Sequence, residues 1–245
     1  MKQADNVPAN SDVTPASETA VPEEAVRWAR KLRERLLADP YRPGYHFCVP
    51  EDMGQPGDPN GAFYHDGRYH LMYLYNRSGS GFCWGHVSSQ DLVHWRHHRD
   101  AIGPGDGDEG CFSGGAFVDD DGSAVLSYWM LWGGRGIGLA FAKAPDFQIW
   151  TKSAANPVIG STEWGFTESR DPYGRTIHYG SADPSNIWKR DGRYYMLTGN
   201  LLVLEKLGRV PDAPLSKQGD RLYLFASENL REWRNLHVFY ERNPQ

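Results

Sequence analysis

The chain of 245 residues has few cysteines, no excess of basic side chains and no long apolar run. The three cysteines, Cys48, Cys83 and Cys111, cannot all pair, and none stands in a C-x-x-C motif. This excludes a disulfide framework and a zinc finger, so we expect buried free thiols. The net charge is −5, so we expect no nucleic-acid partner. The longest apolar stretch, residues 124–132, is too short to cross a bilayer, so we expect no membrane partner either.

His94, His97 and His98 are close in sequence and could suggest a metal site. They lie in a polar segment that also carries two arginines, and cations there disfavour a bound metal ion. We therefore expect no metal at these histidines.

Glycine, proline and aromatic residues are abundant, with 27 Gly, 16 Pro and 13% aromatics, which predicts an all-β fold rich in turns. Residues 1–22 are small and polar and lack the apolar core of a signal peptide, so we expect a disordered leader and a cytoplasmic location. Residues 23–40 carry apolar side chains at helical spacing and predict a short helix on the outside of the main domain. The β pattern occupies residues 41–245.

Within this β region, two modules alternate three times: an Asp-Gly hairpin signature and a segment that ends in tryptophan. The hairpins centre on Asp66-Gly67, Asp121-Gly122 and Asp191-Gly192, and the tryptophans are Trp95, Trp150 and Trp233. The third copy is longer, with a loop insertion at about residues 207–219. A repeat of roughly four short strands is typical of a β-propeller blade. Because three blades cannot close a propeller, we expect the missing blades to come from downstream sequence or a partner chain.

A polar motif stands eight residues before each hairpin aspartate: Asp58-Pro59, Ser113 and Asp183-Pro184. Equivalent positions on the innermost strands of successive blades converge on the central channel of a propeller. Two carboxylates that face one pocket are the arrangement that glycoside hydrolysis requires. The repeat therefore predicts Asp58 and Asp183 as catalytic residues.

Several motifs, in their order along residues 42–240, resemble glycoside hydrolase family 32, the invertases, levanases and inulinases. The matching segments are Arg42-Pro43-Gly44-Tyr45-His46-Phe47, Gly57-Asp58-Pro59-Asn60-Gly61, Trp84-Gly85-His86, Phe112-Ser113-Gly114 and Asn156-Pro157-Val158-Ile159. The resemblance implies a five-bladed propeller that hydrolyses β-fructofuranosidic bonds in sucrose, fructo-oligosaccharide or fructan by a retaining mechanism. That mechanism needs only carboxylates, so no cofactor is expected.

The resemblance also implies roles for individual residues. Asp58 would be the nucleophile, and Asp183 would hold sugar hydroxyls and stabilise the transition state. The fructose subsite would be formed by Phe112 and Ser113, with Asn60 and Trp84 near it.

A literal Arg-Asp-Pro motif also occurs at Arg170-Asp171-Pro172. We assign the family motif to Asp183 instead, because a strand and hairpin follow Asp183, whereas a turn follows Asp171. Residues 160–181 then form an insertion at the rim of the pocket, from which Arg170 and Asp171 are expected to contact substrate.

The chain departs from the family at Gly57, Leu74 and Ala182, where the pattern has Asn, Gln and Arg. Losing these polar groups changes which sugar the site favours. The family carries its general acid in a Glu-Cys-Pro motif, which we expect beyond Gln245. Glu241 is not followed by Cys and Pro, so we interpret it as a surface charge. Without an acid the loss is about 10²–10⁴-fold, so this chain alone should be nearly inactive.

Two other functions fit the same pattern. A five-bladed furanosidase acting on another sugar, such as arabinan, would also use two aspartates and a glutamate. A non-catalytic, sugar-binding propeller would explain the three departures. Transfer of the fructosyl unit, instead of hydrolysis, is a further variant, because the sequence does not show which acceptor reaches the intermediate.

Overall fold

The computed structural model describes residues 54–77, 79, 81–132, 135–145, 147–199 and 221–241, together with residues 34, 38, 40 and 41. The chain divides into two compact units, Met1–Arg42 and Pro43–Gln245, and all the strands belong to the second. The predicted leader, nearly all of the predicted helix at 23–40 and the predicted loop insertion lie outside the described residues. In the described part of the chain, no helix has the length and apolar character needed to cross a membrane.

The described residues form three antiparallel sheets and a separate hairpin, so the predicted all-β class is confirmed. The first sheet contains β1 (Gly54–His65), β2 (Arg68–Arg77), β3 (Gly81–Ser89) and β4 (Trp95–His97). The second contains β5 (Gly110–Val118), β6 (Ala124–Leu131), β7 (Gly136–Ala142) and β8 (Trp150–Lys152), with β9 (Ile159–Gly160) paired to β7. The third contains β12 (Trp188–Arg190), β13 (Arg193–Thr198), β14 (Arg221–Ser227) and β15 (Arg234–Glu241). The hairpin is β10 (Phe166–Arg170) and β11 (Thr176–Gly180).

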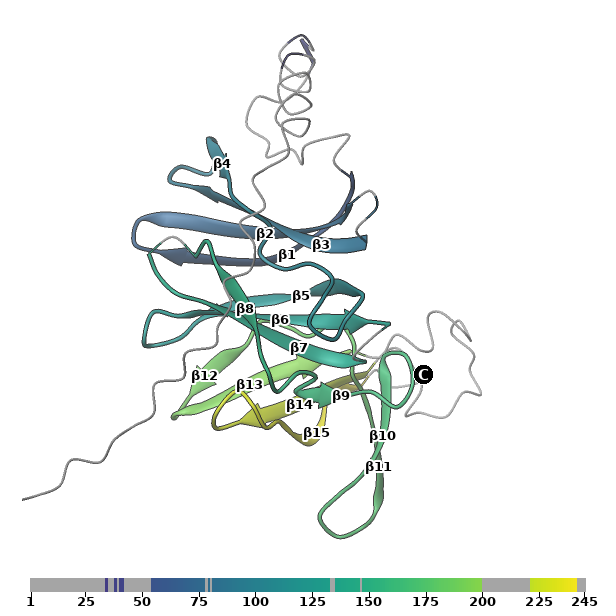
Figure 1. The fold of residues 1–245 in the computed structure, drawn as a ribbon. Coiled ribbons are helices and arrows are strands. Elements are labelled where there is room, and N and C mark those ends of the chain that lie inside the picture. The colour runs from purple at the N-terminus through teal and green to yellow at the C-terminus, as the bar shows by residue number, and fades with distance from the viewer. Residues whose placement is uncertain are drawn as a thin grey trace, which may run out of the picture. The chain divides into compact units, whose positions relative to one another are not determined.

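In each sheet four strands pair in chain order, which is the meander of a propeller blade. The three blades follow one another in chain order in Figure 1, and the β10–β11 hairpin projects from them. The predicted repeat is therefore present as three blades within the described residues. A total of five blades and the N-terminal helix stay predictions.

The Asp-Gly signatures produce tight turns in two of the three blades. Both residues have positive φ at Asp66-Gly67 (45° and 76°) and at Asp191-Gly192 (52° and 74°), as a two-residue type I′ turn requires. In the second blade only Gly122 has positive φ, and the Asp119 amide donates to the Ser123 carbonyl across a wider loop. The signature thus predicted all three hairpins, but not the longer loop of the second.

The second module of the repeat also has one backbone conformation in all three blades. Leu92, Phe147 and Leu230 stand at matching positions, and all have positive φ, at 63°, 52° and 61°. The Leu92 and Leu230 amides each donate to the hydroxyl of the serine three residues earlier, at 2.8 Å and 2.9 Å. The turn that leads into the last strand is therefore capped alike in the first and third blades, and the second blade shares the positive φ at Phe147.

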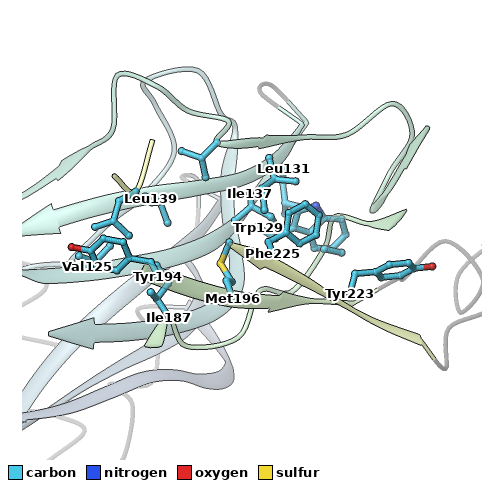
Figure 2. Packing of buried hydrophobic residues seen from close by; sticks show 14 residues of the cluster. Val125, Trp129, Leu131, Ile137, Leu139, Ile187, Tyr194, Met196, Tyr223 and Phe225 are labelled. Atoms are coloured by element: carbon cyan, nitrogen blue, oxygen red, sulfur yellow. The ribbon is translucent and has the colours of Figure 1, made fainter. Parts of the chain in front are cut away.

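Buried side chains of the second and third blades form a continuous apolar core (Figure 2). Trp129 and Leu139 come from the second blade, and Met196 and Phe225 come from the third. Each such side chain stabilises the fold by about 1.5–3 kcal/mol when it is fully buried. The described cysteines, Cys83 and Cys111, are buried free thiols, as predicted.

The first strands of the first two blades, and the segment before β12 in the third, approach one another closely at two glycines. A Cβ at Gly61 would lie 2.6 Å from the Ala116 Cβ, and a Cβ at Gly115 would lie 2.3 Å from Asn186 Oδ1. The same Asn186 oxygen accepts a hydrogen bond of 3.0 Å from the Ala116 amide. This close approach places the polar motifs of the three blades beside one another.

Candidate active site

Asp58 and Ser113 both lie at irregularities in the first strand of their blades. The register between β1 and β2 shifts on either side of Pro59, and the register between β5 and β6 shifts between Cys111 and Gly114. Such bulges re-aim side chains and are common next to active sites. Here they bring the two side chains together: Ser113 Oγ donates a hydrogen bond of 2.6 Å to Asp58 Oδ2.

Asp183 precedes β12 in the third blade and has a positive φ of 41°. Its Oδ1 atom is buried and has no hydrogen-bond partner in the described structure. Burial first, and then the negative charge of Asp58, raises the pKa of Asp183 to about 6. The carboxylates of the first and third blades are therefore close enough to interact, as the repeat predicted.

Asn60 lies two residues after Asp58 and is half-buried. Both the nitrogen and the oxygen of its amide are buried without a hydrogen-bond partner among the described residues. A buried polar atom without a partner costs free energy, so such atoms point to a missing ligand. Together with Asp183 Oδ1, they offer one donor and two acceptors, which suits a ligand rich in hydroxyl groups.

The structure places Trp84 beneath the site and not on its surface. Its side chain is fully buried, and its indole nitrogen donates a hydrogen bond of 3.0 Å to the Phe112 carbonyl. The Phe112 ring is half-buried and meets Phe82 and Trp129 edge-on, at centroid distances of 4.9 Å and 5.6 Å. Trp84 therefore positions the segment that carries Phe112, and its own ring is not exposed to solvent.

Arg170 and Asp171 lie at the tip of the β10–β11 hairpin, which projects from the blades (Figure 1). Arg170 donates to the Gly174 carbonyl, at 2.9 Å. The Asp171 carboxylate caps the amides of Tyr173 and Arg175 and also pairs with the Arg175 side chain, at 2.6 Å. These contacts stabilise the turn, and the structure does not bring either residue to Asp58.

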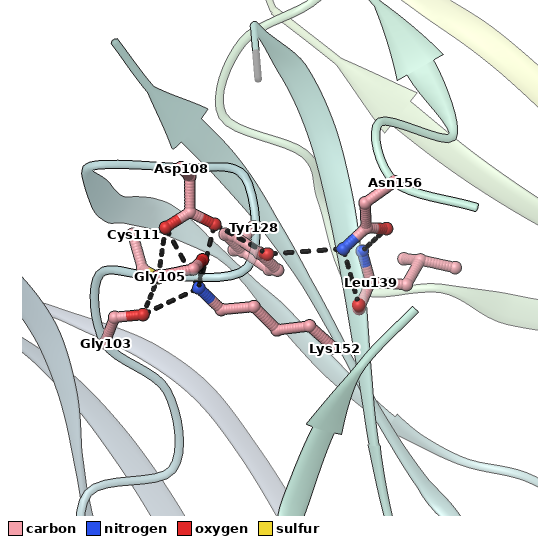
Figure 3. A network of polar contacts seen from close by, with 8 residues as sticks. All are labelled: Gly103, Gly105, Asp108, Cys111, Tyr128, Leu139, Lys152 and Asn156. Carbon is pink, nitrogen blue, oxygen red and sulfur yellow. Dashed lines mark hydrogen bonds and ion pairs between the residues drawn. The ribbon is translucent and has the colours of Figure 1, made fainter. Parts of the chain in front are cut away.

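A buried ion pair supports the segment that leads into β5 (Figure 3). Lys152 Nζ lies 2.9 Å from both carboxylate oxygens of Asp108 and also donates to the carbonyls of Gly103 and Gly105. Tyr128 donates a further hydrogen bond of 3.0 Å to Asp108. Burial raises the pKa of Asp108, and the hydrogen bond and charge of Lys152 oppose that effect. The network anchors the loop just before Phe112 and Ser113.

The histidines considered as metal ligands make other contacts. His94 pairs with Asp91 at 2.7 Å, and His98 contacts Ser88 and Gln148, each at 2.7 Å. Across the residues that the structure describes, no group of three or more His, Cys, Asp or Glu side chains could hold a metal ion.

Comparison with known proteins shows the family to which this chain belongs. The sequence profile of the glycosyl hydrolases family 32 N-terminal domain matches residues 50–245. The chain belongs to glycoside hydrolase family 32.

Relatives within family 32 include sucrose-6-phosphate hydrolase of Klebsiella pneumoniae, 32% identical over 219 residues, covering 82% of this chain and 38% of the relative. An insoluble β-fructofuranosidase isoenzyme of Oryza sativa subsp. japonica is 32% identical over 231 residues, covering 86% of this chain and 34% of the relative. Among solved structures, fructan 1-exohydrolase IIa of Cichorium intybus aligns with a TM-score of 0.59 and 26% identity, covering 81% of this chain and 34% of its own. The chain thus spans less than two fifths of the length of these relatives.

Two of the departures from the family 32 pattern are in contact with each other. A Cβ at Gly57 would lie 3.2 Å from Leu74 Cδ2, so these two positions are neighbours in space in this chain. Leu74 is buried. The apolar side chain of Leu74 therefore lies beside the segment that carries Asp58.

The third departure, Ala182, is fully buried, and its backbone pairs with Gly199. An arginine side chain at this position would need space that the structure does not provide. The adjacent Asp183 therefore has no cationic side chain beside it at position 182, which agrees with its raised pKa.

Proposed function

We propose that this protein cleaves β-fructofuranosidic bonds with retention of configuration, with Asp58 as the nucleophile. The observation that carries the proposal is the hydrogen bond of Ser113 to Asp58, from two different blades, together with the effect of the Asp58 charge on Asp183 of the third blade. Ser113 orients the Asp58 carboxylate through its hydrogen bond. Asp183 and Asn60 supply the buried polar atoms that lack partners.

The chemistry follows from these positions. A carboxylate oxygen of Asp58 forms a bond to the anomeric carbon of the fructosyl unit while the glycosidic C–O bond breaks, and the leaving oxygen takes a proton from a general acid. Water then cleaves the fructosyl–Asp58 ester and restores the carboxylate. The ionised Asp183 accepts hydrogen bonds from sugar hydroxyls, and its negative charge stabilises the oxocarbenium-like transition state.

Glu241 does not fit the role of the general acid. It lies on β15, the outermost strand of the third blade, and pairs with Arg221 of β14. This contact agrees with the interpretation of Glu241 as a surface charge. The acid is left unassigned among the described residues.

We propose a terminal β-fructofuranosyl unit as the group that is transferred. Sucrose 6-phosphate, β-fructofuranosides and fructan are the substrates in the names of the relatives, and each presents such a unit. The fructosyl unit would occupy the space bordered by Asp58, Asn60, Ser113 and Asp183, where its hydroxyls would pair with the buried polar atoms.

Fructose release from sucrose by the full-length protein tests the assignment. Asp58→Asn removes the nucleophile and is expected to lower kcat by at least about 10³-fold. Asp66→Asn is the matched control, because Asp66 is an exposed turn residue with positive φ, which asparagine also tolerates. Full activity of the Asp58→Asn protein would contradict the proposal.

A sugar-binding protein without turnover is the second candidate, and the Gly57, Leu74 and Ala182 departures favour it. It predicts saturable binding of fructo-oligosaccharide in calorimetry together with no release of fructose. Turnover that disappears in Asp58→Asn but persists in Asp66→Asn would exclude this candidate.

A further inference from the structure

The backbone at Asp183 has a conformation that the surrounding chain must hold in place. Its φ is 41°, in the left-handed region, although the next residue is Pro184 and a residue before proline favours extended backbone. Backbone outliers of this kind persist only where the surrounding structure holds them. The Oδ1 atom of Asp183 cannot supply that support, because it is buried without a hydrogen-bond partner in the described part of the chain. The support must therefore come from the residues on either side of Asp183.

Ser181, two residues before Asp183, is at the centre of a series of hydroxyl groups. Its side chain is fully buried, and its Oγ lies 2.6 Å from Ser161 Oγ and 2.9 Å from Thr167 Oγ1. Thr167 donates its own proton to the Gly160 carbonyl, at 2.7 Å, so it accepts the proton of Ser181. Ser161 consequently donates to Ser181. The three hydroxyl groups thus donate in one direction, which ends at Gly160.

The partners of Ser181 belong to segments outside the third blade. Gly160 ends β9, which pairs with β7 of the second blade, and Thr167 lies on β10 of the hairpin. The Ser181 amide adds a backbone hydrogen bond of 3.0 Å to the Gly165 carbonyl. The segment before Asp183 is therefore tied to an edge of the second blade.

The segment after Asp183 is also tied to the second blade. Ser127, on β6, donates a hydrogen bond of 2.8 Å to the Ser185 carbonyl. The Ser185 amide donates to the Leu197 carbonyl at 2.9 Å, and the Leu197 amide donates to Ser185 Oγ at 3.0 Å. Neutral groups thus fix the backbone on both sides of Asp183.

The second blade contacts the other carboxylate directly, through the hydrogen bond from Ser113 to Asp58. This blade carries a serine where the first and third blades carry an aspartate. It therefore holds Asp58 through Ser113 and the Asp183 segment through Ser181. The place of each carboxylate relative to the other depends on both serines.

We propose that Ser181 is a positioning residue, whose hydroxyl holds Asp183 in its left-handed conformation and in its place opposite Asp58. This inference rests on the proposed function, because Ser181 acts through Asp183. Neither the repeat nor the resemblance indicated a role for Ser181. Without its hydroxyl, the segment before Asp183 loses its tie to β9, and the carboxylate moves towards solvent.

NMR of the full-length protein with ¹³C-labelled aspartate carboxyl groups tests this placement without a measurement of activity. The Asp183 signal is the one that is missing from Asp183→Asn. Burial first, and then the charge of Asp58, raises the pKa of Asp183 to about 6, so a carboxylate that has moved in Ser181→Ala should titrate about one pH unit lower. Ser88→Ala is the matched control, since Ser88 is a buried serine of the first blade with its hydroxyl 2.7 Å from His98. It should leave the titration of Asp183 unchanged.

Steady-state kinetics separate positioning from a general loss of stability. Ser181→Ala should lower kcat for fructose release about tenfold and change KM by less than about threefold, because the misplaced group acts mainly in the transition state. Ser88→Ala should leave kcat within about twofold. Thr167→Val removes the acceptor at nearly the same shape and should reproduce the effect of Ser181→Ala, including where that variant does not fold. Thr167→Ser keeps the hydroxyl and should retain most of the activity.

The outcomes separate this inference from the proposed function. An Asp183 titration that is the same in Ser181→Ala and in the unmodified protein overturns the role of Ser181, as do equal losses of kcat in Ser181→Ala and Ser88→Ala. Absence of fructose release from the unmodified protein contradicts the proposed function, whereas the NMR titration still decides whether Ser181 holds Asp183 in place.

Discussion

Ser113 of the second blade donates a hydrogen bond of 2.6 Å to the Asp58 carboxylate of the first blade. A hydrogen bond to a charged group contributes about 1.5–3 kcal/mol. Ser113→Ala should therefore lower kcat/KM for fructose release by about 10- to 100-fold, because Asp58, the proposed nucleophile, loses its orientation. Steady-state kinetics of the full-length protein measure this.

Ser113→Thr keeps the hydroxyl and serves as the comparison for Ser113→Ala. It should retain more activity than the alanine variant if the hydrogen bond matters. Equal activity of the alanine variant and the unmodified protein would show that Ser113 does not orient Asp58.

Asp183 makes stability fall as the pH rises. Its pKa is raised to about 6 in the folded protein, from an ordinary value of 3.8. The folded state therefore holds a proton that the unfolded state has released, and the stabilisation present below pH 3.8 is lost as the pH rises through 6. At pH 7, Asp183→Asn should raise the free energy of unfolding by about 1–3 kcal/mol while abolishing fructose release. Urea unfolding at pH 4 and pH 7 tests this, and a stabilisation of equal size at both would contradict the ionisation argument.

His86 has the opposite effect on stability. Its ring lies between His70, at a nitrogen–nitrogen distance of 2.9 Å, and His98, at a centroid distance of 4.4 Å. Burial, and then the charges of His98 and His70, lower the pKa of His86 to about 3. The contribution to stability is complete above the ordinary value of 6.5 and declines towards pH 3, because only the unfolded state gains the proton.

The consequence is a measurable slope of stability against pH. Between pH 6 and pH 4, the free energy of unfolding should fall by up to about 1.4 kcal/mol per pH unit through His86. His86→Gln removes the titrating ring and should flatten this slope. An unchanged slope in the variant would show that His86 does not titrate on unfolding.

The Lys152–Asp108 pair predicts a large effect on stability. Their side chains are 7% and 0% exposed, so Lys152→Met leaves a buried carboxylate without its cation. The expected loss is about 3–5 kcal/mol, and adding Asp108→Leu should recover part of it. Lys143→Met, at an exposed position, should change stability by no more than about 0.5 kcal/mol. Chemical denaturation measures all three, and a small loss in Lys152→Met would show that the pair is not important for stability.

Local patterns in the sequence predicted most of the described fold. Alternating apolar residues around Asp-Gly determine a hairpin within a few residues, so Asp66-Gly67 and Asp191-Gly192 predicted the two strands and the position of the turn between them. The equal offset of Asp58, Ser113 and Asp183 from their hairpins predicted that they lie near one another, because repeated blades place equivalent positions alike. Their catalytic roles stay predictions.

Contacts between distant residues had no local signal. Lys152 and Asp108 are 44 residues apart, and each alone has the sequence context of a surface charge. Trp84 belongs to a recognisable motif, but a motif does not say which side of a twisted strand faces the core. Trp129 and Trp164 meet only after the segment that follows β9 has folded back on the second blade.

The contact of Asn186 with Gly115 links the docking of the third blade to the arrangement of the proposed catalytic residues. Asn186 reaches the second blade only when the third has docked, and it stands three residues after Asp183. A chain whose third blade has not yet formed during synthesis holds Asp58 and Ser113 without their counterpart. A nascent chain therefore gains its pair of interacting carboxylates only when the third blade has docked on the second.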